Sequence, residues 1–311
     1  MDERIGLIIR GINNIFSVIP LEELPDLSNP IACRIKGKVL SNVEAEYNPL
    51  AVGDKVLFNS DKLILKRLDR KNSFQRWNAK GQSNQTLVAN VDLVIIVTSS
   101  DEPPFRPRFV DRAIVCSQNA PILIVLNKSD FSLTEEQQKR FDHYKELGYE
   151  TLQLSAFNEG EVAKLKEKII GKTVALIGQS GVGKSTLVNA LLDDENLQRT
   201  GSISKKYQRG RHVTRYSIML NGDDFLMVDT PGMRELLIPY TEASLIADSF
   251  VEFREYAKQC AFQSCLHKME PNCKVKEAVE KNLIHHDRYV SYLRMLDSLD
   301  ERPESWQLER R

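Results

Sequence analysis

The sequence of 311 residues lacks the features that mark several large classes of protein. No apolar run approaches the roughly 18 residues that a membrane-spanning helix requires, and the longest are short pieces such as Ile122 to Leu126. The first residues, MDERIGLIIRGINN, carry acids where a signal peptide needs positive charge. There is no internal repeat and no low-complexity tract. We therefore expect a cytoplasmic protein that has no membrane partner.

A net charge is also missing, because 43 Lys and Arg balance 43 Asp and Glu. Any attraction to nucleic acid must then come from local patches. Residues 31–80 contain eleven basic and five acidic residues, and residues 201–220 contain five basic residues and no acid. These two segments are candidates for contact with RNA phosphates.

Cysteine is scarce, with five in the whole chain. Thiols stay reduced in the cytoplasm, so clustered cysteines there indicate a metal more often than a disulfide. Three of them cluster with a histidine in the pattern Cys260-x4-Cys265-x-His267-x5-Cys273. Three thiolates and one imidazole suit one structural Zn²⁺ ion with no open coordination position. The alternative is a group of buried free cysteines beside an incidental histidine.

The hydrophobic pattern divides the chain into three parts. Short β-like runs such as VGDKVLF and KLILKRL occupy the first part, and they fit an OB-type barrel or another small β fold. From about Val91, buried strands alternate with helical segments, which predicts an α/β domain with a mostly parallel sheet. After Pro239 the apolar residues recur at helical spacing. We expect a multidomain α/β protein with domains at residues 1–68, 69–238 and 239–311.

The segment GQSGVGKS, Gly178 to Ser185, matches the phosphate-binding P-loop. It follows the strand-like run TVALI and opens the helical run STLVNALL, as a P-loop does. Its backbone N–H groups would surround the phosphates, Lys184 would reach the β and γ phosphates, and Ser185 would bind Mg²⁺. The predicted nucleotide-binding residues here are Gly178, Gln179, Ser180, Gly181, Val182, Gly183, Lys184, Ser185 and Thr186.

A guanine-reading motif precedes the P-loop. NKSD follows the strand-like run PILIVL, at the edge where open α/β sheets bind ligands. A carboxylate there accepts two hydrogen bonds from guanine, whereas adenine would leave it unpaired, which argues against an ATP-dependent relative. Ser155 and Ala156 end the next strand and resemble the backbone contact to guanine O6, although Ser155 also suits a helix cap. The predicted guanine-binding residues are Asn127, Lys128, Ser129, Asp130, Ser155 and Ala156.

The segment DTPG follows the run FLMV. Asp229 is placed to hold Mg²⁺ through water, and the N–H of Gly232 can meet the γ-phosphate. Between this segment and the P-loop lies a basic stretch, where we expect a threonine to complete the Mg²⁺ shell. Thr214 is our choice for that threonine, and Thr200 is the alternative.

The chain lacks the glutamine that Ras-like enzymes carry directly after the DxxG glycine, since Met233 stands there. A methionine cannot orient the attacking water. His212, two residues before Thr214, has suitable chemistry and a pKa that is ordinarily near neutral. The alternative is that His212 is a surface residue of an RNA-facing loop.

The order of these motifs, NKSD before P-loop before DTPG, resembles the circularly permuted RsgA family of GTPases, also called YjeQ or YloQ. RKNSFQR, GRHVTR, DTPGMRE and CAFQSCLHKMEPNCKVKEAV add to the resemblance, which covers nearly the whole chain. The family commonly reads His-Thr-Thr-Thr where this chain has His212-Val213-Thr214-Arg215.

The resemblance implies an OB-fold, a permuted G domain and a zinc domain. It implies GTP hydrolysis to GDP, with Mg²⁺, stimulated by the small ribosomal subunit during its late maturation, and a catalytic role for His212. We expect a monomer that contacts 16S rRNA. The alternative function is a GTP-gated rRNA-binding assembly factor with negligible catalysis of its own.

Overall fold

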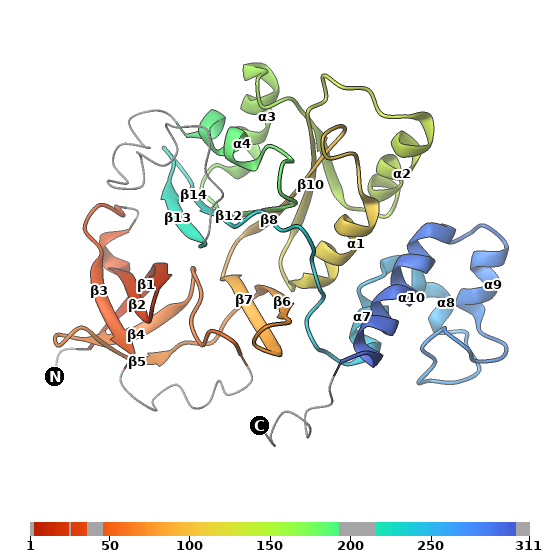
Figure 1. The fold of residues 1–311 in the computed structure, drawn as a ribbon, viewed down its shortest axis with the longest axis horizontal. Helices are drawn as coiled ribbons and strands as arrows, with labels where there is room; N and C mark the ends of the chain where they lie inside the picture. Colours follow the sequence, from red (N-terminus) through yellow and green to blue (C-terminus); the bar gives the residue numbers. More distant parts are fainter. Residues whose placement is uncertain (1–2, 25, 36–45, 193–215, 303–311) are drawn as a thin grey trace.

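The computed structural model describes residues 3–24, 26–35, 46–192 and 216–302. Along the chain it forms a small β-barrel, a sheet flanked by helices, and a helical C-terminal part (Figure 1). Across these ranges, no helix is both long enough and apolar enough to cross a membrane. His212, Thr214 and the alternative Thr200 lie outside the described residues.

Five strands build the barrel: β1 (Glu3–Ile12), β2 (Ile15–Pro20), β3 (Ile31–Ile35), β4 (Lys55–Asn59) and β5 (Leu63–Arg67). They follow the order β1-β2-β3-β5-β4, and β4 pairs again with β1, so the sheet closes on itself. A short 3-10 helix, η1 (Leu21–Glu23), follows β2. The interior is apolar, with Ile8 and Val56 fully buried. The expected small β-barrel is confirmed, and its five closed strands fit the OB type.

The β1–β2 hairpin was not among the strands that the sequence pattern indicated. Its two-residue turn is Asn13-Asn14, with φ of 50° and 60°. Asparagine tolerates this left-handed region, and such a turn matches the twist of paired strands. The sequence signal for this hairpin was therefore an Asn-Asn pair between two apolar runs.

The central part is a mostly parallel sheet. Its strands are β8 (Leu93–Ser99), β10 (Ile122–Asn127), β11 (Glu150–Gln153), β12 (Thr173–Gly178), β13 (Ile218–Asn221) and β14 (Leu226–Asp229). The order is β11-β10-β8-β12-β14-β13, and only β13 runs antiparallel to its neighbour β14. Its helices are α1 (Pro107–Cys116), α2 (Glu135–Glu146), α3 (Glu159–Ile169) and α4 (Lys184–Leu191). The predicted alternation of strands and helices is confirmed.

Local signals explain where two of these helices begin and end. Thr134 caps α2 in a capping box with Gln137. The chain leaves α2 and α3 through Gly148 and Gly171, whose φ values are +87° and +71°. Glycine adopts this conformation without steric cost, so both helices end just before these residues.

A second sheet, of three strands, lies below the central sheet in Figure 1. It contains β6 (Ser73–Asn78), β7 (Ser83–Ala89) and β9 (Ser117–Gln118). Near it, Arg70 pairs with Asp54 at 2.7 Å and with Glu46 at 2.9 Å, and Arg67 pairs with Glu46 at 3.1 Å. These two arginines therefore add less to a basic RNA-facing surface than the residue counts suggest.

The C-terminal part is helical, as expected. It contains α7 (Ala243–Asp248), a 3-10 helix η4 (Val251–Phe253), α8 (Arg254–Ala257), α9 (Lys274–Glu280) and α10 (His286–Asp300). In Figure 1, α10 and α7 lie beside α1 of the central part. A buried charge cluster joins them, because Asp111 of α1 meets Arg288 of α10 at 2.8 Å and Arg140 of α2 at 2.9 Å.

The burial of this cluster makes Asp111 a sensitive position. We expect Asp111→Asn to destabilise the protein by about 3 to 5 kcal/mol, because two buried guanidinium groups lose their shared counter-charge. Asp297→Asn is the matched control, since the Asp297–Lys268 pair at 2.8 Å is largely exposed and such pairs contribute about 1 kcal/mol or less. Urea unfolding of both variants measures the difference. Equal stability of the two variants would refute the role of the cluster.

Candidate functional site

The predicted nucleotide residues gather at the carboxyl ends of the parallel strands. Asn127 ends β10, Gly178 ends β12, and Asp229 ends β14. β8, which carries none of these motifs, lies between β10 and β12 in the sheet. Segments that follow one another at intervals of 51 residues in the chain therefore share one edge, which is where open α/β sheets bind ligands.

The P-loop has the backbone that its glycines predict. Gly181 and Gly183 both have φ of +89°, and Gly183 immediately precedes α4. A Cβ atom on Gly183 would lie 2.3 Å from Nδ2 of Asn127, and one on Gly178 would lie 2.4 Å from the carbonyl oxygen of Val97. These positions accept only glycine, since any side chain would displace the loop or the neighbouring strand.

Lys184 is the buried cation of this loop. Its side chain is 7% exposed, and its Nζ donates to the carbonyl oxygens of Gly178 at 2.8 Å and Gln179 at 2.9 Å. Burial lowers the pKa of Lys184 to about 8, and the negative charge of Asp229 partly opposes this shift. The ammonium group is thus held inside the loop, where it can exchange backbone carbonyls for phosphate oxygens. Ser185 and Thr186 follow it in the first turn of α4.

This pKa predicts how nucleotide affinity depends on pH. Below pH 8 Lys184 already carries its proton, so GTP affinity should stay constant as pH rises toward 8. Above pH 8 Lys184 loses its proton in the free protein, and the binding of GTP must restore it. The dissociation constant for GTP should therefore rise by up to about tenfold per pH unit. Titration calorimetry between pH 7 and pH 9.5 measures both the affinity and the proton uptake. An affinity that stays constant across this range, without proton uptake, would contradict the prediction.

Asn127 connects three of the predicted segments. Its Nδ2 donates to the carbonyl oxygen of Val182 in the P-loop at 2.9 Å, and its Oδ1 accepts from the backbone N–H of Ala156 at 3.1 Å. The side chain is 1% exposed, so both bonds lie inside the protein. One amide thus fixes the guanine motif, the P-loop and the Ser155-Ala156 segment relative to one another.

A carboxylate that sequence reasoning missed supports the same region. Glu161 on α3 accepts hydrogen bonds from the backbone N–H of Ser155 at 2.6 Å and from Oγ of Ser129 at 3.2 Å. Ser129, Asp130, Ser155 and Glu161 line a hollow of about 370 Å³ together with Phe157 and Asn158. Asp130 is exposed there and can meet a ligand, whereas Lys128 donates from Nζ to the carbonyl oxygens of Asp101 and Glu102. The sequence signal for Glu161 was the position of this acid in the first turn of α3.

The segment DTPG lies against the P-loop. Asp229 is buried at the end of β14, beside Leu176 of β12, and Oγ1 of Thr230 donates to the carbonyl oxygen of Leu176 at 2.6 Å. A Cβ atom on Gly232 would lie 3.1 Å from Cα of Ser180 and 3.3 Å from Nζ of Lys184. Gly232 therefore stands beside the lysine that is predicted to hold the γ-phosphate.

Met233 continues this contact through its backbone. Its carbonyl oxygen accepts from the N–H of Ser180 at 3.1 Å, and its side chain is 3% exposed within the apolar core. Met233 thus positions the segment and has no polar group for orienting water. His212 and Thr214, which fall outside the described residues, keep their roles as predictions.

The C-terminal part brings the four predicted zinc ligands together. Their ligand atoms all lie within 4.8 Å of one another. Nδ1 of His267 is 3.3 Å from Sγ of Cys273 and 3.7 Å from Sγ of Cys260, and the sulfur atoms of Cys260 and Cys273 are 3.9 Å apart. Bonds of about 2.3 Å to sulfur and 2.0 Å to nitrogen in a tetrahedron require separations of this size. With Cys265, the donor set fits one structural Zn²⁺ ion.

The loop that carries these ligands is stabilised by its neighbours. The carboxylate of Glu270 accepts from the backbone N–H groups of Leu266, Lys268 and Met269. Tyr289 of α10 donates to the carbonyl oxygen of His267 at 2.7 Å. The loop is thereby held in shape by groups other than the ligands themselves, as metal sites commonly require.

Comparison with known proteins agrees with this geometry. The family model described as RsgA GTPase matches residues 67–239. The chain belongs to the RsgA GTPase family. A relative from Borreliella burgdorferi, named small ribosomal subunit biogenesis GTPase RsgA, is 39% identical over 298 residues, which cover 94% of this chain and 95% of the relative. A protein of the same name from Chlorobaculum parvum is 35% identical and covers 87% of this chain and 92% of its own length.

Solved structures of RsgA relatives have the same fold. YjeQ from Thermotoga maritima superposes with a TM-score of 0.70 and 29% identity, covering 97% of this chain and all of its own. YloQ, a circularly permuted GTPase, superposes with a TM-score of 0.68 at 23% identity. The predicted permuted GTPase fold is confirmed, and membership of this family implies GTP, GDP and Mg²⁺ as ligands of the site described above.

Proposed function

We propose that this chain hydrolyses GTP to GDP and phosphate on the small ribosomal subunit and assists the late maturation of that subunit. The observation that carries the proposal is the Asn127 side chain, which joins the P-loop and the guanine-reading segments in one site. The relatives' names supply the ribosomal context. The proposal includes contact between this chain and 16S rRNA, and it treats the chain as a cytoplasmic monomer.

The residues of the site divide the work on GTP between them. Asp130 accepts from the guanine edge, while the N–H of Ala156 and the amide of Asn127 fix the loops around it. The P-loop from Gly178 to Thr186 holds the phosphates. Ser185, Thr214 and Asp229 would hold Mg²⁺, which shields phosphate charge when bound.

GTP hydrolysis with and without purified small ribosomal subunits tests the proposal. We expect subunits to raise the turnover rate. An unchanged rate would contradict the ribosomal part of the proposal and leave the nucleotide site standing. A failure to bind GTP at all would contradict the nucleotide site itself.

His212 distinguishes the enzyme from a GTP-gated assembly factor with negligible catalysis. In our proposal His212 orients the attacking water, so His212→Ala should lower turnover by about 10² to 10⁴ while GTP still binds. His286→Ala is the matched control, because His286 is an exposed residue at the start of α10. Equal turnover of the two variants would contradict the catalytic role of His212, and negligible turnover of the wild type as well would favour the assembly factor.

We also propose that residues 1–68, 69–238 and 239–311 act as an OB-type RNA-binding domain, a G domain and a zinc domain. A separate apolar cluster around Ile8 and Val56 supports the first of these boundaries. The donor set of Cys260, Cys265, His267 and Cys273 supports one structural zinc ion in the third domain.

A further inference from the structure

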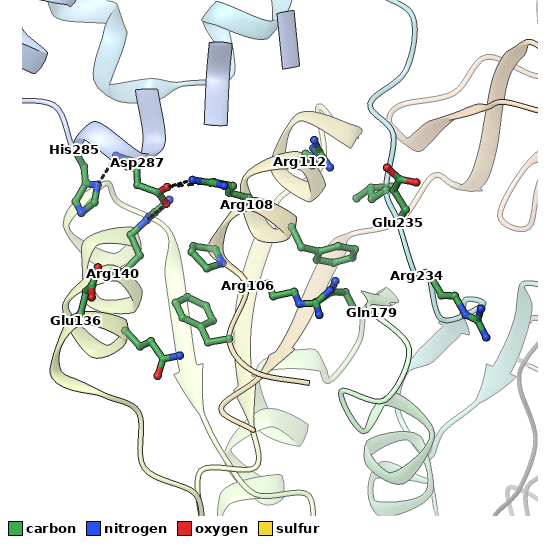
Figure 2. A pocket seen from close by; sticks show the side chains of 15 residues that line it. Arg106, Arg108, Arg112, Glu136, Arg140, Gln179, Arg234, Glu235, His285 and Asp287 are labelled. Carbon is green, nitrogen blue, oxygen red and sulfur yellow. Dashed lines mark hydrogen bonds and ion pairs between the residues drawn. The ribbon is translucent and has the colours of Figure 1, made fainter. Parts of the chain in front are cut away.

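A large cavity lies next to the predicted GTP site, where the central part meets the C-terminal helices. Its volume is about 710 Å³, within the range of small-molecule sites. Figure 2 shows side chains reaching it from α1, from α2, from the start of α10 and from the segment that follows Met233. The recognised motifs contribute Gln179 of the P-loop and Arg234 and Glu235 of DTPGMRE to the lining, and the other lining residues belong to none of them.

Arginine dominates the charged lining of the cavity. Three acids, Glu136, Glu235 and Asp287, face five arginines. The arginines are Arg106, Arg108, Arg112, Arg140 and Arg234.

Asp287 is already engaged by two of these arginines. It pairs with Arg108 at 3.0 Å and with Arg140 at 3.4 Å, as the dashed lines of Figure 2 show. Within the described part of the chain, no carboxylate pairs with Arg106, Arg112 or Arg234. The cavity therefore holds positive charge that the protein itself does not neutralise.

Arg140 adds a buried positive charge to the wall of the cavity. Its side chain is only 5% exposed, and its Nη2 and Nε donate to Asp111 and Asp287. Its Nη1 is buried and has no hydrogen-bond partner among the described residues. The guanidinium group lies over the ring of Tyr144, 4.7 Å from its centroid, so Arg140 contributes charge to the cavity and no free donor.

The helix that carries Arg108 and Arg112, and that Arg106 precedes, favours an anion as well. α1 begins with Pro107 at its first position, no acid stands in its first turn, and no side chain caps it. The positive end of the helix dipole therefore faces the same space as Arg106 and Arg108.

We propose that this cavity binds a phosphate group of an anionic ligand distinct from the GTP in the P-loop. Arginine forks bind phosphate oxygens in pairs, and Arg106 and Arg112 are lining arginines that no carboxylate of the described residues engages. The source is either a free phosphoanion or a phosphodiester of RNA. Gln179 of the P-loop and Arg234, two residues after Gly232, also line the cavity, so the cavity adjoins both segments.

The first experiment measures the binding of inorganic pyrophosphate by calorimetry. The protein is first saturated with Mg²⁺ and a non-hydrolysable GTP analogue, so that pyrophosphate cannot enter the P-loop, and this loading step separately reports any failure of the GTP site. We expect R106Q/R112Q to weaken pyrophosphate binding at least tenfold. Arg294→Gln on α10, which removes the same charge from an exposed position outside the cavity, should leave the binding unchanged.

The second experiment replaces pyrophosphate with a short single-stranded RNA and follows fluorescence anisotropy. Loss of pyrophosphate binding alone in R106Q/R112Q supports a free phosphoanion, and loss of RNA binding supports a phosphodiester. The proposal is overturned if neither probe binds, or if both bind R106Q/R112Q as tightly as the R294Q control. Arg106 is exposed and Arg112 half-buried, and melting curves of the variants verify that the fold is retained.

Discussion

Replacing Lys184 by alanine is expected to lower kcat/KM for GTP by about a hundredfold to a thousandfold. The lysine is held inside the P-loop by the carbonyl oxygens of Gly178 and Gln179, and it lies beside the position of Gly232. Removing one preorganised donor from a phosphoryl-transfer site costs a factor of this order, because water cannot replace a buried ammonium group. Steady-state kinetics of GTP hydrolysis measure the loss.

Lys164→Ala is the matched control for this substitution. Lys164 is exposed on α3, and its loss should leave kcat/KM unchanged. Lys184→Ala also removes a buried charge whose pKa is lowered by burial, so we do not expect it to unfold the protein. If kcat/KM for GTP in Lys184→Ala stays within threefold of the wild-type value, the P-loop assignment is wrong.

Replacing Cys273 by serine is expected to abolish zinc binding and to unfold much of the C-terminal part. Cys273 is 5% exposed and immediately precedes α9, so the ligand is also part of the packing of this region. Structural zinc contributes on the order of 10 kcal/mol to the folding of small domains that depend on it. Metal analysis should find one zinc ion in the wild-type chain and none in the variant, and circular dichroism should show lost helix.

Cys116→Ala separates this effect from the general cost of losing a buried cysteine. Cys116 is fully buried at the end of α1, away from the cluster, and burial raises the pKa of its thiol well above the ordinary value. This variant should keep its zinc. If Cys273→Ser also keeps a full equivalent of zinc, the four-ligand site is wrong.

The parts of the structure that the sequence predicted are those with local signals. Gly148 and Gly171 end their helices because only glycine enters the left-handed region without cost. The P-loop is recognisable because its glycines, Lys184 and Ser185 stand at fixed spacing between a strand and a helix. The four zinc ligands lie within fourteen residues of one another, so their chemistry is visible in one short segment.

The parts that the sequence did not predict depend on distant contacts. Asp111 and Arg288 are 177 residues apart, and nothing near either residue indicates the other. The hairpin of β6 and β7 was missed because polar residues such as Gln75 and Asn84 weaken its alternation. Glu161 reads as an ordinary acid in the first turn of a helix, and only the fold shows that it holds Ser129 and Ser155.

The position of β12 in the sheet has a consequence for synthesis of the protein. β8, β10 and β11 leave the ribosome first, and β12 must later add to the open side of β8, whose seven residues are all buried in the finished fold. Lys184 follows Asn127 by 57 residues, a delay of about 3 to 11 s at bacterial rates of translation. During that interval the nascent chain exposes an apolar strand edge and has a guanine motif but no P-loop. Unpaired strand edges are prone to aggregation, so slow translation between β11 and β12 should make this chain depend on chaperones.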